Sequence, residues 1–92
     1  WLLNHEQGHF DITALGMREL YNLLMGLSAD SPAALNRLAG QHQTTIQSRI
    51  DELNRLYDVQ TNHGVNSSEQ ARWTSRIQTA KSTSAGVLND LR

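Results

Sequence analysis

The sequence has no cysteine, a single proline and few aromatic residues. Without cysteine, the chain can form neither disulfides nor thiolate–zinc bonds, and its redox compartment stays undetermined. Aromatic residues make up 5% of the 92 residues and apolar residues 38%, so we expect a modest, mainly aliphatic core. A chain of this length forms one domain or part of one and buries a limited share of its surface. A bound metal or a partner would therefore matter for its stability.

The sequence also lacks an excess of charge of either sign and any long apolar run. Eight basic residues stand against nine acidic ones, for a formal net charge of −1, and no block of like charge occurs. This composition argues against a nucleic-acid groove or an anionic membrane surface. No apolar run approaches the roughly 20 residues that a membrane-spanning helix needs. We therefore expect no nucleic-acid partner and no membrane span.

The apolar residues follow a helical period and give no strong strand signal, so we expect a mainly α fold. Over residues 2–27, and again from Pro32 to about Val59, they recur mostly at spacings of three and four, which predicts two long helices. Ser31 and Pro32 have the pattern of an N-cap followed by a proline at the first helical position. The predicted packed faces are Leu3, Phe10, Ile12, Leu15, Leu20, Leu23, Leu24 and Leu27 in the first helix and Leu35, Leu38, His42, Ile46, Ile50, Leu53 and Tyr57 in the second.

A third helix is expected after a break near Asn62 and Gly64, either of which can adopt the left-handed conformation of a helix end. Ser67 and Gln70 have the spacing of a capping box at the start of this helix. Its expected apolar face is Trp73, Ile77, Ala80, Val87, Leu88 and Leu91. The chain is therefore predicted to form a long antiparallel helical hairpin plus a third helix, in a single domain over residues 1–92.

The motif H-E-Q-G-H, from His5 to His9, is the most informative stretch of the sequence. Two histidines four positions apart lie one above the other on a helix, so both can bind one ion. Glu6 is rotated by about 100° from His5, where it can reach a metal-bound water rather than the metal itself. This is the arrangement of a zinc hydrolase. Gly8 indicates that another element packs close against this turn. The alternative to a metal site is a pair of solvated surface histidines.

A zinc site of this type needs a third protein ligand from farther along the chain. The pattern with a histidine six residues after the motif is excluded, because Leu15 stands there. If the hairpin turns near Asp30, two helices that each rise about 1.5 Å per residue bring residues 54–58 level with His5. The sequence reads Y-D-V-Q-T-N-H-G over residues 57–64, and this block offers several side chains to a zinc site.

Three residues of this block are candidates for the site. His63 is our first choice as third ligand, because it lies just past the helix and Gly64 eases a turn back over the metal. Asp58, which projects from the helix itself, is the second choice; if His63 is the ligand, Asp58 can instead hold a ligand imidazole by a hydrogen bond. Tyr57 is either a donor to the oxyanion of a tetrahedral intermediate or a packed residue between the helices.

These blocks, W-L-L-N-H-E-Q-G-H-F-D-I, Y-D-V-Q-T-N-H-G and Q-A-R-W, resemble the bacterial family of predicted secreted zinc-dependent proteases, over Trp1 to about Trp73. The resemblance implies an uncharacterised zincin-like domain and a secreted or periplasmic location in the bacterial envelope. It also implies additional strands before the metal helix. The chain, which begins without a methionine, is then interpreted as the helical fragment of a longer α+β domain whose upstream strands are missing. In zincins such a sheet edge holds the peptide substrate as an added strand.

The leading hypothesis is a zinc metallopeptidase, with Zn²⁺ held by His5, His9 and His63 and with a bound water activated by Glu6. Its partners would be a peptide or protein substrate and an upstream segment or partner chain that completes the domain. The alternative is a metal-stabilised helical module for binding or assembly without catalysis. The two differ in the number of protein ligands, because a catalytic zinc keeps a position for water and a structural zinc has four protein ligands. Asp58 and His63 binding together would favour the structural alternative.

Overall fold

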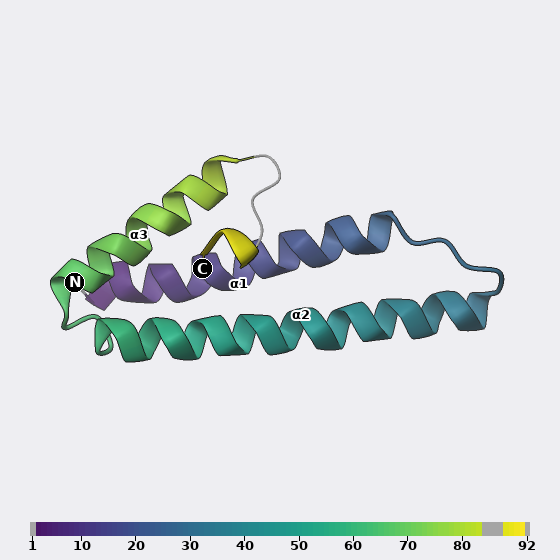
Figure 1. Ribbon diagram of the computed structural model, residues 1–92, viewed down its shortest axis with the longest axis horizontal. Helices are drawn as coiled ribbons and strands as arrows, with labels where there is room; N and C mark the ends of the chain where they lie inside the picture. The colour runs from purple at the N-terminus through teal and green to yellow at the C-terminus, as the bar shows by residue number, and fades with distance from the viewer. Residues whose placement is uncertain (1, 84–87, 92) are drawn as a thin grey trace.

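The computed structural model describes residues 2–83 and 88–91, which form three α-helices and one short 3₁₀ helix. Helix α1 (Leu2–Met25) and helix α2 (Pro32–Thr61) run antiparallel along the length of the molecule, which measures 50 × 23 × 20 Å (Figure 1). Helix α3 (Ser67–Ser82) packs against both long helices at the end of the hairpin where α1 begins and α2 ends, and the 3₁₀ helix η1 (Leu88–Leu91) lies against α1 and α3. The predicted mainly α fold, a long hairpin plus a third helix, is confirmed, and no strand occurs in the described residues.

The beginning and end of α2 follow from its terminal residues. Ser31 has an extended backbone, and its hydroxyl accepts a hydrogen bond of 3.1 Å from the backbone N–H of Ala34, so the predicted cap before Pro32 is confirmed. The helix ends two residues beyond the predicted Val59, where Asn62 takes the left-handed conformation with φ of 48°. This sharp end turns the chain directly into α3.

The start of α3 differs from the predicted capping box. Asn66, not Ser67, is the N-cap, and its side-chain oxygen accepts from the backbone N–H of Glu69 at 3.1 Å. Because an asparagine side chain satisfies this N–H as well as a serine does, the box is not needed. Gln70, the expected partner in that box, instead points inward and is 5% exposed. The predicted apolar residue Val87 lies outside the described residues.

The core is built at the end of the hairpin that α3 and η1 cover. Its buried apolar residues come from every element and are Ile12, Leu15, Ile46, Ile50, Leu53, Tyr57, Trp73, Ile77, Ala80, Leu88 and Leu91. Two side-chain bonds attach the end of α3 to α1: Lys81 lies 3.3 Å from Asp11, and Arg18 donates to the carbonyl of Ala80 at 3.0 Å. The far end of the hairpin, around the loop between α1 and α2, has no α3 beside it (Figure 1).

The packed faces of the two long helices were only partly predicted. Leu3 and Phe10, expected on the packed face of α1, are 83% and 69% exposed. The buried face instead begins with His5 and Gly8, two residues that an apolar stripe does not include. Leu35, expected in the second packed face, is exposed because it lies at the uncovered end of the hairpin.

Gly8 permits a close approach of α1 and α2 beside His5 and His9. A Cβ atom at this position would lie 2.1 Å from the hydroxyl oxygen of Tyr57, so only glycine fits without displacing that ring. The prediction of close packing at Gly8 is confirmed. Because His5 and His9 flank this glycine on α1, the contact brings both histidines up against α2. No helix in the described part of the chain is long and apolar enough to cross a membrane.

Candidate metal centre

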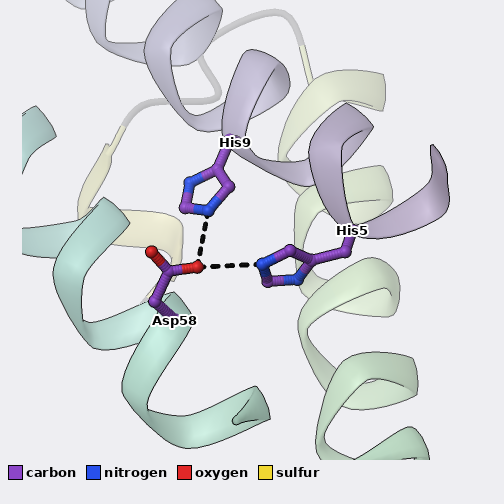
Figure 2. Close-up of side chains that lie close together, drawn as sticks. All are labelled: His5, His9 and Asp58. Carbon is purple, nitrogen blue, oxygen red and sulfur yellow. Dashed lines mark hydrogen bonds and ion pairs between the residues drawn. The ribbon is translucent and has the colours of Figure 1, made fainter. Parts of the chain in front are cut away.

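Two histidines of α1 and one aspartate of α2 converge on a single point near the N-terminus of α1. The Nε2 atom of His5 lies 2.8 Å from Oδ1 of Asp58, and Nε2 of His9 lies 2.6 Å from the same oxygen (Figure 2). These three potential ligand atoms all lie within 4.8 Å of one another. The four-residue spacing of the motif places both rings on one side of α1, and the hairpin places Asp58 opposite them.

The three side chains fit a zinc ion with small adjustments. Two imidazoles and one carboxylate form a common ligand set of catalytic zinc sites, with bonds of about 2.0–2.1 Å. Tetrahedral bonds of that length separate ligand atoms by about 3.3 Å, so the distance from Asp58 to His5 would lengthen by about 0.5 Å and that to His9 by about 0.7 Å. The side chain of His5 is 3% exposed, whereas those of His9 and Asp58 are 25% and 32% exposed. The site is therefore closed around His5 and open to solvent beside the other two.

Side-chain amides form hydrogen bonds with both histidines at Nδ1, the ring nitrogen that does not face Asp58. Nδ1 of His5 lies 2.9 Å from Oε1 of Gln70 on α3, and Nδ1 of His9 lies 2.7 Å from Oδ1 of Asn54 on α2. Hydrogen bonds of this kind orient metal-binding imidazoles in proteins. The sequence prediction missed both amides. Asn54 could have been found, because it lies four residues before Asp58 on the same face of its helix.

Asp58 remains a carboxylate in this surrounding. Burial works to raise the pKa of the Asp58 carboxyl, but hydrogen bonds with His5 and His9, and the charge of these histidines, outweigh it and lower the pKa below its ordinary value. A carboxyl group binds a metal ion in its ionised form. Asp58 therefore offers a ready anionic ligand over the whole neutral range.

Tyr57 is buried at the back of the site. Its ring is fully buried and stacks on the ring of His5 at a centroid distance of 4.6 Å. Its hydroxyl donates to the backbone carbonyl of His5 at 2.9 Å and accepts from Nε2 of Gln70 at 2.7 Å. Burial, the largest effect, raises the pKa of the Tyr57 hydroxyl above its ordinary value, with a smaller opposite contribution from the Gln70 hydrogen bond. This position agrees with the packed residue that the sequence offered as one alternative, and the role as oxyanion donor stays a prediction.

Glu6 and His63, the other predicted site residues, lie at the open side. Glu6 is exposed, and within residues 2–83 and 88–91 it makes no side-chain hydrogen bond or ion pair. Its charge is nonetheless close enough to contribute to the raised pKa of Tyr57. Nδ1 of His63 lies 3.7 Å from Oδ1 of Asp58, and its side chain is 77% exposed. Asp58 thus contacts both motif histidines directly, whereas His63 contacts Asp58 at a longer distance. The role of His63 as third ligand stays a prediction.

Together, these features define an α-helical protein with a candidate metal centre of two histidines and one carboxylate. The chain belongs to the family described as "Bacterial protein of unknown function (DUF922)", whose model matches residues 1–64. The match includes His5, His9, Asp58 and His63 and ends before Gln70. No curated protein and no solved structure matches the chain.

Proposed function

We propose that this chain is the helical, metal-binding part of a bacterial zinc-dependent peptidase with a zincin-like domain. One observation carries the proposal: the two motif histidines of α1 and Asp58 of α2 direct three ligand atoms to one point, and the exposed Glu6 directly follows His5 on α1. We assign Nε2 of His5, Nε2 of His9 and the carboxylate of Asp58 as the zinc ligands. A peptide or protein is the proposed substrate, and a secreted or periplasmic location is proposed from the resemblance in sequence.

The proposed chemistry divides between the metal and the protein. Bound zinc would polarise the peptide carbonyl and lower the pKa of water to about 7. Glu6 lies on the solvent-exposed side of α1 directly after His5. There its carboxylate would accept the proton of the attacking water and then deliver it to the leaving amine. Asn54 and Gln70 would keep the two ligand imidazoles oriented throughout.

The proposal is tested by zinc content and peptide hydrolysis in the same preparations. We expect the purified chain, together with any segment that completes its domain, to bind one zinc ion and to hydrolyse an unfolded protein substrate. Glu6→Gln should retain zinc and lose hydrolysis by at least about 100-fold, as expected for loss of a general base. Asp58→Asn should lose both. The matched controls Glu52→Gln and Asp51→Asn, at exposed positions of α2, should lose neither.

A second candidate function is a metal-stabilised helical module for binding or assembly. The observation that favours it is the position of His63, 3.7 Å from Asp58, because a fourth protein ligand would close the site. Zinc binding without any hydrolysis, unchanged by Glu6→Gln, would replace the peptidase with this module. A chain without zinc affinity would contradict both.

A further inference from the structure

We propose that Gln70 on α3 is a positioning residue of the metal centre, which holds His5 in the tautomer that carries its hydrogen on Nδ1. The role in metal binding rests on the proposed function, whereas the tautomer is a property of the chain itself. Gln70 lies beyond the residues that the family model matches. Helix α3 therefore contributes a residue to the site in addition to covering the core.

The direction of each hydrogen bond around Gln70 follows from its neighbours. The hydroxyl of Tyr57 lies 2.9 Å from the backbone carbonyl oxygen of His5, which has no hydrogen to donate, so the hydroxyl donates to it. The same hydroxyl must then accept from Gln70, whose Nε2 lies 2.7 Å away and also 3.3 Å from the hydroxyl of Thr74. The amide nitrogen is thereby fixed on the side of Tyr57, and the amide oxygen on the side of His5.

This orientation decides which nitrogen of His5 carries hydrogen. Oε1 of Gln70 lies 2.9 Å from Nδ1 of His5 and can only accept, so Nδ1 is the donor. In a neutral imidazole the other nitrogen, Nε2, then has a bare lone pair. That lone pair faces Oδ1 of Asp58 at 2.8 Å. Two bare acceptors at this distance repel each other. Either a proton on Nε2, which makes the hydrogen bond from a charged His5 to Asp58, or a metal ion in the place of that proton relieves the repulsion.

His9 shows the same arrangement with a different amide. Nδ2 of Asn54 donates to the backbone carbonyl of Ile50 at 3.1 Å, which leaves its oxygen to accept from Nδ1 of His9 at 2.7 Å. The Nε2 lone pair of His9 is thereby also directed to Asp58. Two amides on different helices therefore prepare both imidazoles for one metal ion. Asn54 lies on the same helix as Asp58, so Gln70 is the member of the pair that depends on α3.

The tautomer can be measured directly by long-range ¹H–¹⁵N NMR of the histidine rings in the metal-free, ¹⁵N-labelled chain, at a pH where the rings are neutral. We expect hydrogen on Nδ1 for both His5 and His9. Gln70→Met, which keeps the length of the side chain but removes both polar atoms, should move the hydrogen of His5 to Nε2, where it can be donated to Asp58. His9 should keep its hydrogen on Nδ1. His5 with its hydrogen on Nε2 in the unaltered chain would overturn the inference without any variant.

Zinc affinity, measured by competition with a chromophoric chelator, provides the second readout. Gln70→Met should weaken zinc binding by about 10–100-fold, the usual effect of removing a hydrogen bond behind a metal ligand. Gln70→Glu, which keeps an acceptor oxygen for Nδ1, should restore the tautomer and most of the affinity. Two controls on α3 should change neither readout: Gln78→Met repeats the exchange at an exposed position, and Ile77→Val loosens the buried face.

The outcomes separate this inference from the proposed function. Unchanged zinc affinity in Gln70→Met, or an equal loss in Ile77→Val, would overturn the positioning role while the metal site stands. Absence of zinc binding in the unaltered chain would instead contradict the proposed function. In that case the NMR comparison still decides whether Gln70 sets the tautomer of His5.

Discussion

At the scale of single residues, the site depends on how closely α2 can approach α1. Tyr57 lies between His5 and Trp73, with ring centroids 4.6 Å and 5.2 Å away, and its hydroxyl reaches across the backbone at Gly8. The glycine inside H-E-Q-G-H is therefore explained by packing and not by flexibility of the helix. A side chain at position 8 would push Tyr57 away from the ring of His5 on which it stacks. It would also displace Gln70, which donates to the Tyr57 hydroxyl.

Gly8→Ala should destabilise the protein although alanine favours helix by about 1 kcal/mol over glycine. The added Cβ would lie 2.1 Å from a fully buried hydroxyl, and overpacking of this kind costs about 1–3 kcal/mol. Gly40→Ala on α2 is the matched control, because nothing lies within 4 Å of its added Cβ, and it should stabilise by about 0.5–1 kcal/mol. Urea unfolding followed by circular dichroism measures both. Equal stability of the two variants would contradict the packing argument.

At the scale of elements, the sequence predicted which segment of α2 faces the motif histidines but not which side chain contacts them. The rise of two antiparallel helices placed residues 54–58 level with His5, and Asn54 and Asp58 do lie against the motif histidines. The choice between Asp58 and His63 depends on the rotation of α2 about its axis and on the backbone after it. Neither follows from spacing alone. The sequence also did not place Gln70 of α3 at the site, because its spacing from Ser67 is that of a capping residue.

The chain after α2 provides a test of whether the site is open or closed. Asn62 and His63 both have left-handed backbones, with φ of 48° and 54°, a conformation that costs a non-glycine residue roughly 1–2 kcal/mol. His63→Gly should therefore keep or raise stability in urea unfolding. If the metal has three protein ligands, this variant should also keep its zinc affinity.

Asn62→Gly is the matched control for His63→Gly, because it relieves the same backbone strain one residue earlier. It removes no imidazole and should bind zinc like the unaltered chain. A loss of about tenfold or more in His63→Gly alone would make His63 a ligand. That result would favour the closed, structural alternative.

At the scale of the whole molecule, the hairpin is closed at its two ends in different ways. At one end the short loop between α1 and α2 joins the helices covalently (Figure 1). At the other end the contacts are those of His5 and His9 with Asp58, together with the core beneath α3. The sequence predicted the lengths and the antiparallel order of the helices. The apolar period did not include His5 and Gly8 in the inward face of α1, where both are buried. The close packing at Gly8 was predicted from the glycine itself.

A metal ion bound at this end should therefore raise the free energy of unfolding of the whole chain. Zinc that binds only the folded chain at 100 times its dissociation constant adds about 2.7 kcal/mol, which for a domain of this size raises the melting temperature by roughly 10–20 °C. Thermal unfolding with and without zinc measures the shift. Asp58→Asn should abolish it and Asp51→Asn should not, because only the first removes a proposed ligand. Magnesium, which prefers six oxygen ligands, should give little shift. An equal shift with magnesium, or in Asp58→Asn, would place the stabilising ion elsewhere on the molecule.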